Sequence, residues 1–533
     1  MKTPILACLG VILLSLPALP AAAETASVRI TDGEVRGVAA DGVTSYKGIP
    51  FAAPPVGDLR WRAPQPVKPW SGLKAADAFA PSCIEDPGML KRFGAPERVS
   101  EDCLYLNVWT PAGTAGQKLP VMVWIYGGGF SGGATSMPLY DGTHLAQKGV
   151  VVVSVAYRLG PFGFLAHPDL SRESGGKGSG TYGLQDMIAG LRWVKSNIAG
   201  FGGDPGRVTI FGESAGGIAV SMLAASPPAH GLFHGAISES GGSLAPPRFA
   251  NEGGQNVPSL ATAEKQGKEF LDGLGAKDMA AARALSAGRL QKAAGAGLGR
   301  FWPALDGYLL PGDEYELYSE GHFNETPVLI GTNSDEGALF VRGPATPGAF
   351  EAQIRGGYGA KADTILAAYP HTTDAEALRS TRDVFRDTAF GWPTWSWARL
   401  QSRHEKGQEK DQEKDKSNKV YVYYFDHRNA AMPDGSTHGS EMTYVFRNSG
   451  PGGAPNSDDA ALTERMSDYW VNFAKTGDPN GAGLPHWPAF EEPQQLVLHI
   501  DGTTRAEPVP NLTQLRALDD YYAWRRQQAH ASN

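Results

Sequence analysis

The sequence has no stripe of basic residues and no apolar run long enough to cross a membrane. Its 48 Lys and Arg residues stand against 56 Asp and Glu residues, so the formal net charge is -8. Without clustered positive charge, a nucleic acid is not an expected partner. An apolar content of 41% leaves too much polar surface for a membrane protein but is ample for a large core. No internal repeat stands out, so we expect one large folded block.

The most concentrated apolar stretch lies at the N-terminus. Lys2 gives it a positive start, residues 5–16 are apolar, and Ala21-Ala22-Ala23 resembles a small-residue cleavage site. This pattern predicts a signal peptide over residues 1–23, with a mature chain from Glu24. A membrane anchor is the rival interpretation, but the run is too short to span a bilayer and prolines interrupt its end. We therefore expect a secreted or periplasmic protein without a stable membrane anchor.

Cysteine is also scarce. Beyond Cys8 in the predicted signal peptide, the chain has only Cys83 and Cys103. Two cysteines in an exported protein suggest one disulfide. Two buried free thiols are the alternative, which export disfavours.

What the sequence does contain is a regular series of strand-like and helix-like segments. A short hairpin is expected over residues 28–37, with Asp32-Gly33 at its turn. Helical periodicity marks residues 186–197, and a small apolar helix is expected over residues 218–225. Further strands are expected at residues 104–110, 119–126, 150–156, 208–211, 235–238, 328–330, 420–425 and 496–500. Alternating strands and helices predict an α/β fold with a mostly parallel sheet covered on both faces.

Residues 405–419 interrupt this pattern. They alternate Glu, Lys, Gln and Asp with no apolar residue. A binding tail is one interpretation, but we expect a solvated, low-complexity loop without a catalytic role. It lies inside a single predicted domain that covers residues 24–533.

The clearest chemical signal is Gly212-Glu213-Ser214-Ala215-Gly216, directly after the expected strand 208–211. A strand, a sharp turn at serine and a small apolar helix form a nucleophile elbow, in which the flanking glycines leave room for the turn. Gly-x-Ser-x-Gly alone is also common in ordinary loops. The strand before it and the helix after it favour the elbow, with Ser214 as nucleophile.

A serine hydroxyl needs a base, and that base needs an orienting carboxylate. In the hydrolase arrangement the chain order is serine, acid, histidine. The segment Asn333-Ser334-Asp335-Glu336-Gly337 follows a predicted strand and is the best place for the acid. His438, on a loop after the strand 420–425, is one candidate base among 12 histidines.

The oxyanion of a tetrahedral intermediate needs N–H donors. One is expected from Ala215, the residue after the nucleophile. Gly127-Gly128-Gly129-Phe130 follows the buried strand 119–126 and can supply the others, because glycine lets the backbone approach a carbonyl closely. A flexible surface turn is the alternative for these glycines.

Several ordered motifs strengthen this interpretation and extend it. They are Gly48-Ile49-Pro50-Phe51-Ala52, Glu101-Asp102-Cys103-Leu104-Tyr105-Leu106-Asn107-Val108, Tyr126-Gly127-Gly128-Gly129-Phe130, Tyr157-Arg158-Leu159-Gly160, Phe201-Gly202-Gly203-Asp204-Pro205, residues 211–217 and Asp335-Glu336-Gly337. With them, the chain resembles the type-B carboxylesterase family, the group that includes the cholinesterases, from about residue 28 to about residue 525.

The resemblance implies an α/β-hydrolase fold and a serine carboxylesterase that needs no cofactor and no metal. It also implies roles for individual residues: Ser214 as nucleophile, Glu336 as acid, His438 as base, Gly128, Gly129 and Ala215 as the oxyanion hole, Cys83 and Cys103 as a disulfide, Ser240 as a hydroxyl beside the acid, Glu213 as a carboxylate beside the nucleophile, and Arg158 with Asp186 as a structural ion pair.

The chain also departs from the cholinesterase pattern. Where cholinesterases carry a choline-binding tryptophan, it has Lys91-Arg92-Phe93, and no cysteine follows Cys103. No tetramerisation helix is evident at the C-terminus, so we expect a monomer or a weak homodimer. Lys91 and Arg92 would repel a cationic ester, and Arg248 and Arg342 are further candidates for cations near the entrance.

The leading hypothesis is therefore a secreted serine esterase acting on a small-molecule ester. A neutral or polycarboxylate ester, as in fumonisin toxins, is one candidate substrate. An inactive adhesion protein with the same fold is the alternative of a different class, and amide or carbamate hydrolysis on the same triad is another. The presence of Ser214, Glu336 and His438 together argues against the inactive relative.

Overall fold

The computed structural model describes residues 27–111, 113, 116–247, 257–295, 300–341, 343, 345–407, 419–430, 432–450 and 459–532. The predicted signal peptide, most of the charged segment 405–419, Arg248 and Arg342 lie outside these residues. Among the helices within them, none is both long enough and apolar enough to pass through a bilayer.

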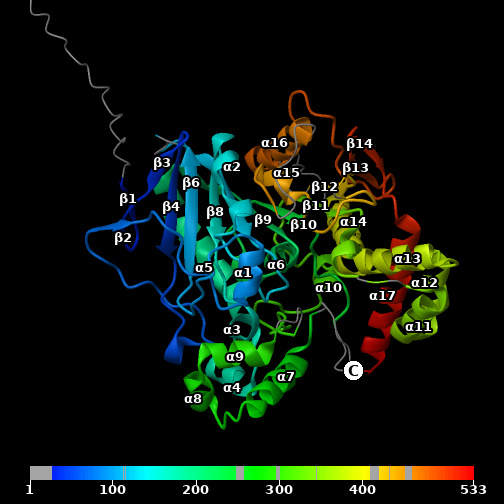
Figure 1. The fold of residues 1–533 in the computed structure, drawn as a ribbon, viewed down its shortest axis with the longest axis horizontal. Coiled ribbons are helices and arrows are strands. Elements are labelled where there is room, and N and C mark those ends of the chain that lie inside the picture. Colours follow the sequence, from blue (N-terminus) through cyan, green and yellow to red (C-terminus); the bar gives the residue numbers. More distant parts are fainter. Residues whose placement is uncertain are drawn as a thin grey trace, which may run out of the picture.

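A large mixed sheet forms the centre of the molecule (Figure 1). In the described residues it has 11 strands in the order β14-β13-β12-β11-β10-β9-β7-β8-β6-β4-β3. The run from β13 to β8 is parallel throughout, and the strands beyond it at both edges pair antiparallel. The α/β-hydrolase expectation is thus confirmed in its main feature, a large and mostly parallel sheet.

The strands of this sheet are β3 (Val38–Ala40), β4 (Val43–Pro50), β6 (Tyr105–Pro111), β7 (Leu119–Ile125), β8 (Val151–Val155), β9 (Gly203–Glu213), β10 (Gly235–Glu239), β11 (Val328–Asn333), β12 (Val420–Phe425), β13 (Leu496–Ile500) and β14 (Arg505–Pro508). The α-helices are α1 (Pro87–Arg92), α2 (Thr143–Gln147), α3 (Gly160–Phe164), α4 (Pro168–Glu173), α5 (Tyr182–Asn197), α6 (Ala215–Ala224), α7 (Leu260–Gly273), α8 (Met279–Ala284), α9 (Ala287–Ala294), α10 (Glu314–Ser319), α11 (Pro347–Tyr358), α12 (Ala362–Ala368), α13 (Asp374–Arg386), α14 (Trp392–Gly407), α15 (Met442–Phe446), α16 (Ala460–Thr476) and α17 (Leu512–Ser532).

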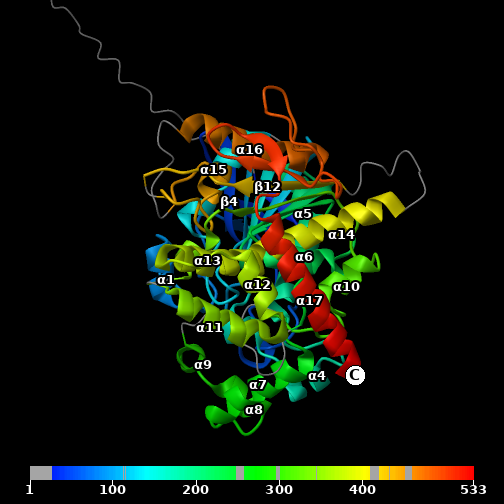
Figure 2. The same cartoon turned by 90° about the vertical axis from the view of Figure 1, so that its right-hand side faces the viewer.

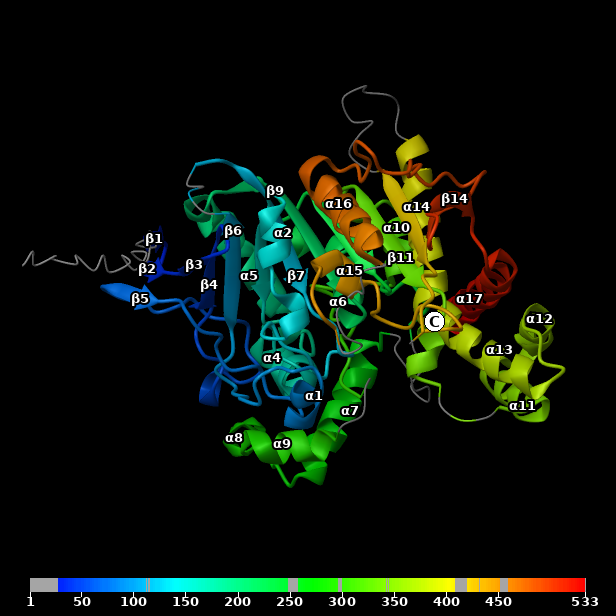
Figure 3. The ribbon, with the colours of Figure 1, turned by 45° about the horizontal axis from the view of Figure 1, so that its top comes forward.

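Helices cover the sheet, and two groups of helices lie beyond it. Helices α7 to α9 gather at the lower end in Figure 1, and α11 to α13 lie at its right-hand side together with α17. Figure 2 brings that side forward and shows α17 running beside α12, with which it is in contact. In Figure 3, α11 to α13 project away from the sheet.

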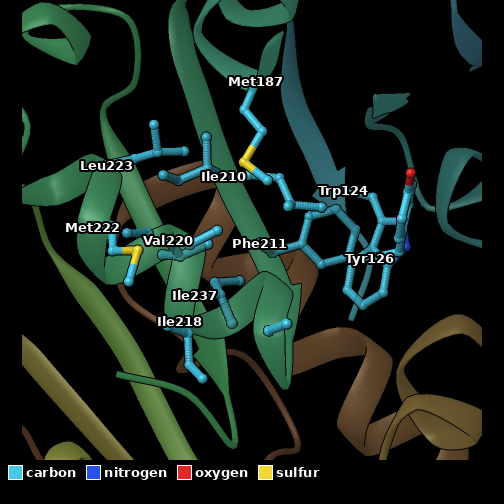
Figure 4. Packing of buried hydrophobic residues seen from close by; sticks show 14 of the residues in the cluster. Trp124, Tyr126, Met187, Ile210, Phe211, Ile218, Val220, Met222, Leu223 and Ile237 are labelled. Atoms are coloured by element: carbon cyan, nitrogen blue, oxygen red, sulfur yellow. The ribbon is translucent and has the colours of Figure 1, made fainter. Parts of the chain in front are cut away.

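The core follows from the uninterrupted apolar strands. Every residue of β8 is buried, as are all residues of β7 after Leu119, which fits strands covered on both faces. Trp124 and Phe211 stand side by side on neighbouring strands with their ring centroids 4.8 Å apart (Figure 4). Helix α6 adds Val220, Met222 and Leu223 to the same cluster. This packing fixes the ends of β7 and β9, from which the site is built.

The first hairpin differs in detail from the sequence prediction. Strands β1 (Ser27–Ile30) and β2 (Gly33–Arg36) pair as expected, but Thr31 and Asp32 form the turn and Gly33 opens the second strand. A Cβ on Gly33 would lie 2.3 Å from the Trp70 ring, so this glycine is required for close packing. Strand β5 (Leu73–Ala75) joins β2 in parallel.

The charged segment also begins differently from the prediction. Helix α14 runs to Gly407, three residues into the segment expected to be a loop, because the alternating Glu and Lys residues there are good helix formers. Strand β12 starts at Val420, as predicted.

Candidate active site

The nucleophile elbow is formed at the carboxyl end of β9. Ser214 has φ 55° and ψ -124°, a conformation that residues with a side chain rarely adopt. A Cβ on Gly216 would lie 2.0 Å from the carbonyl oxygen of Ile125, so only glycine fits there. The Ser214 N–H donates to the Glu239 carbonyl at 2.9 Å, which holds the strained residue in place between β9 and β10.

Glu336 and His438 meet beside this elbow. Glu336 follows β11, His438 follows β12, and His438 Nδ1 lies 2.6 Å from Glu336 Oε2. The other carboxylate oxygen accepts the Ser240 hydroxyl at 2.5 Å and the Asn333 N–H at 2.7 Å. Glu336 is completely buried, and its hydrogen bonds hold it in the position that orients an imidazole.

Asp335, the other acid in this segment, points elsewhere. Its carboxylate lies 3.5 Å from Arg382 and 3.9 Å from Arg379, both on α13. The structure therefore brings Glu336, and not Asp335, against the histidine.

The glycine-rich loop after β7 faces Ser214. Gly128 and Gly129 have φ of 104° and 60°, a region that glycine enters without strain. A Cβ on Gly127 would lie 3.0 Å from Cβ of Ser214, so the loop backbone passes directly beside the elbow. Ala215 begins helix α6, whose free N-terminal N–H groups favour negative charge.

A cavity of about 620 Å³ opens above these residues. Its lining is mostly apolar and comprises Asp86, Gly88, Met89, Arg92, Phe93, Gly127, Gly128, Gly129, Gly133, Met137, Leu139, Tyr140, Glu213, Ser214, Ala215, Ile218, Trp302, Leu339, Phe340, His438, Gly439 and Met442. The volume suits a small organic molecule. Phe93 and Leu339 are well exposed for large apolar side chains, and both line this cavity.

Comparisons with known proteins agree with this geometry. Residues 24–517 match the model of the carboxylesterase family. The chain belongs to this family. It is 40% identical to a fumonisin B1 esterase from Sphingopyxis macrogoltabida over 512 residues, covering 91% of this chain and 89% of the relative. It is 36% identical to a para-nitrobenzyl esterase from Bacillus subtilis (strain 168), covering 90% and 95%.

Solved structures give the same result. A PNB esterase superposes with a TM-score of 0.77 at 34% identity, covering 92% of this chain and 99% of that structure. A thermophilic PNB esterase superposes with a TM-score of 0.79 at 33% identity over the same shares. The protein is a carboxylic ester hydrolase with the α/β-hydrolase fold, and its substrate is a small-molecule ester.

In this carboxylesterase, aromatic rings enclose the histidine. Phe390 stacks on the His438 ring with centroids 4.7 Å apart, and Phe340 meets it edge-on at 5.1 Å. Phe390 belongs to a π-helical turn, Asp387–Gly391, at the start of α14. Such turns often occur at functional sites. No local sequence pattern indicates this contact, because the register of a π-helical turn is set by packing.

A second carboxyl group lies on the far side of the same ring. Glu213 Oε1 is 3.1 Å from His438 Nε2, and both side chains are almost fully buried. Burial raises the pKa of Glu213 to about 7, although the charge of His438 opposes this. Burial lowers the pKa of His438, but the carboxylates of Glu213 and Glu336 outweigh it and raise that pKa to about 9. The imidazole thus lies between two acids.

Two more buried acids surround this pair. Glu239 accepts the Trp470 indole N–H at 2.8 Å, and burial raises its pKa to about 8. Glu441 accepts the side-chain amide of Asn333, and burial raises its pKa well above the usual range. Neither glutamate is predicted as a site residue, since nothing in the sequence pattern indicates that these side chains point inward. No group of three or more His, Cys, Asp or Glu residues in the described part of the chain is arranged to hold a metal ion.

The remaining predicted residues take separate positions. Cys83 and Cys103 form a disulfide, and Arg158 pairs with Asp186 through two contacts of 2.7 Å. The segment between the cysteines carries α1, which contributes Met89 and Arg92 to the cavity wall. The Lys91 side chain is 76% exposed and lies 3.9 Å from Glu97, so it is directed to solvent instead.

Proposed function

We propose that this carboxylesterase hydrolyses its ester through an acyl-enzyme on Ser214. His438 takes the proton of the Ser214 hydroxyl as Oγ attacks the ester carbonyl. The N–H groups of Gly128, Gly129 and Ala215 bind the resulting oxyanion. His438 then gives its proton to the leaving alcohol, and water, activated by the same histidine, releases the acid and restores the serine.

One observation carries this proposal, the 2.6 Å contact between Glu336 Oε2 and His438 Nδ1. It fixes the tautomer in which Nε2 can act as the base, and it stabilises the imidazolium that forms. The strained elbow supports the same assignment, because it presents Ser214 to the cavity that His438 also lines.

The test compares the purified protein with Ser214→Ala and with Ser174→Ala, a matched change at a serine remote from the elbow. We expect hydrolysis of a p-nitrophenyl ester by the wild type and by Ser174→Ala, and none above background by Ser214→Ala. A fluorophosphonate should add its mass once to the wild type and once to Ser174→Ala, and should not label Ser214→Ala. Full turnover by Ser214→Ala would refute the assignment.

For the substrate, we propose a neutral or polycarboxylate ester. Three features support this: the apolar cavity of about 620 Å³, the cationic Arg92 in its wall, and the 40% identity to a fumonisin B1 esterase. A panel of matched neutral, choline and carboxylate-bearing esters, with the corresponding amides and carbamates, decides it by the rate of acid release. Faster cleavage of a choline ester, an amide or a carbamate would replace this proposal.

We further propose that the protein is exported, with cleavage before Glu24, and that it is a monomer or a weak homodimer. Residues 1–23 combine a positive start, an apolar run and a small-residue end, and this pattern supports export. N-terminal sequencing of protein recovered from the medium and the periplasm tests the first point. Light scattering across a concentration series tests the second. An uncleaved N-terminus or a stable tetramer would contradict them.

A further inference from the structure

A buried carboxyl group lies outside the proposed triad, behind the glycine-rich loop. Glu85 is two residues after Cys83 and only 1% exposed. Its Oε2 accepts the Gly133 N–H at 3.0 Å, while Oε1 is buried without a partner. Within the described residues, the Gly133 N–H is therefore the only hydrogen bond of this side chain.

Gly133 ends the loop that carries the proposed oxyanion donors. The Gly128 carbonyl accepts the N–H groups of Ser131 and Gly132, both at 3.1 Å, which closes the loop into a tight turn. Gly133 has φ 108°, and a Cβ there would lie 2.6 Å from the Gly127 carbonyl oxygen. The two ends of the loop therefore touch, so a shift of Gly133 moves Gly127 and the residues that follow it.

The segment of Glu85 also packs against this loop. A Cβ on Gly132 would lie 2.5 Å from the Met89 sulfur and 3.0 Å from Glu85 Oε2. Met89 belongs to α1, and the Cys83–Cys103 disulfide ties this segment to the start of β6. The contact thus joins two loops that are far apart in the sequence.

The surroundings of Glu85 suit a neutral acceptor. Burial raises its pKa to about 8, against the lowering effect of the Gly133 N–H, and Asp86 raises it further. The buried tyrosines Tyr126, Tyr140 and Tyr157 also sense its charge, and none of them can neutralise a carboxylate. A glutamine offers the same acceptor and the same shape as the protonated acid.

We propose that Glu85 is a positioning residue for catalysis: by accepting the Gly133 N–H, it holds the glycine-rich loop so that Gly128 and Gly129 present their N–H groups to the oxyanion. The inference rests on the proposed serine mechanism. It assigns Glu85 no contact with the substrate, and Glu85 is not among the residues that line the cavity.

The test measures kcat and KM for one neutral ester with wild type, Glu85→Gln, Glu85→Asp and Glu85→Met. Glu85→Gln keeps the acceptor and should retain most of kcat. Glu85→Met removes it, and we expect kcat to fall about 10- to 100-fold with KM nearly unchanged, because a displacement of about 1 Å costs up to about 10²-fold. Glu85→Asp is shorter by one carbon–carbon bond, about 1.5 Å, and should lose kcat similarly.

A transition-state analogue separates positioning from general damage. A trifluoromethyl ketone that adds to Ser214 should bind Glu85→Met more weakly by the same factor as kcat/KM falls, while a substrate-like amide should not. If Glu85→Met fails to fold, the contrast between Glu85→Gln and Glu85→Asp decides. Unchanged kcat in Glu85→Met or Glu85→Asp, or an equal loss in Glu85→Gln, overturns the inference. Absence of turnover in the wild type, measured in parallel, would refute the proposed function instead.

Discussion

Glu336 and Glu213 lie on opposite sides of one imidazole, and their surroundings differ sharply. Glu336 accepts hydrogen bonds from Ser240, Asn333 and His438. Glu213 Oε1, although 3.1 Å from His438 Nε2, is buried without a hydrogen-bond partner, and burial raises the pKa of Glu213 to about 7. Both carboxyl groups are buried, so the supply of donors, and not burial alone, distinguishes them.

The difference in hydrogen bonding arises from the residues that surround each carboxylate. The donors of Glu336 come from the ends of β10 and β11, whose positions are fixed by the sheet. Glu213 faces glycines instead: a Cβ on Gly127 or Gly439 would lie 2.8 or 3.2 Å from its carboxylate oxygens. The Glu336 side of the imidazole is therefore rich in hydrogen-bond donors, whereas the Glu213 side is closely packed but poor in donors.

The largest expected effect comes from removing the carboxylate on the donor-rich side. We expect Glu336→Gln to keep the fold and to lower kcat by about 10⁴-fold, because the neutral amide no longer fixes the histidine tautomer or stabilises the imidazolium. Steady-state kinetics with a neutral ester measure this. The matched control is Asp335→Asn, whose carboxylate faces Arg379 and Arg382. Near-normal turnover by Glu336→Gln, or a larger loss in Asp335→Asn, would move the acid to another residue.

The same site shows which of its residues can be predicted from local sequence and which cannot. The elbow, the glycine-rich loop and the Glu336 and His438 loops each lie directly after a strand, so local order along the chain was enough to nominate them. The side chains that surround them come from elsewhere: Phe390 from a π-helical turn and Glu85 from the disulfide segment. Their contacts depend on how distant segments pack, which no local pattern encodes.

The same limit explains the details that were wrong. The sequence predicts the turn of the first hairpin at Asp32-Gly33, because that dipeptide favours tight turns. The structure uses Gly33 to accommodate the Trp70 ring, a contact across 37 residues that a local rule does not contain.

A second effect concerns the cavity wall beside the glycine-rich loop, where the Cys83–Cys103 bridge holds the segment that carries Met89 and Arg92. Replacing both cysteines by serine should lower the free energy of unfolding by about 3 kcal/mol, the chain-entropy value for a loop of roughly this size. Urea unfolding measures it, and intact mass after alkylation without reductant verifies the bridge in the wild type. Two labelled thiols, or equal stability of the double variant, would contradict the prediction.

A third change reduces the charge on the Glu213 side of the imidazole. Glu213→Gln removes a carboxylate that raises the pKa of His438, so that pKa should fall below about 9. The base form of His438 exists above its pKa, so the acid limb of kcat/KM against pH should move to lower pH in the variant. Glu97→Gln, at an exposed glutamate, is the matched control and should leave the limb unchanged. An unshifted limb in Glu213→Gln would show that Glu213 does not set the charge of the histidine.

The smallest effect concerns the charge that the cavity wall presents to the substrate. Arg92 lines the cavity, whereas its neighbour Lys91 is 76% exposed beside Glu97. Glu213 acts in the opposite sense, so the net preference for anionic esters should be modest. We expect Arg92→Ala to lower kcat/KM for a carboxylate-bearing ester about two- to five-fold relative to a matched neutral ester, the range of a solvent-exposed ion pair of up to about 1 kcal/mol.

Lys91→Ala, the same charge change one residue away, should alter the ratio less. Added salt should shrink the Arg92 effect, because a charge at the cavity mouth is screened. If both variants change the ratio equally, the selectivity arises from the general field of the surface, and Arg92 does not contact the bound acid.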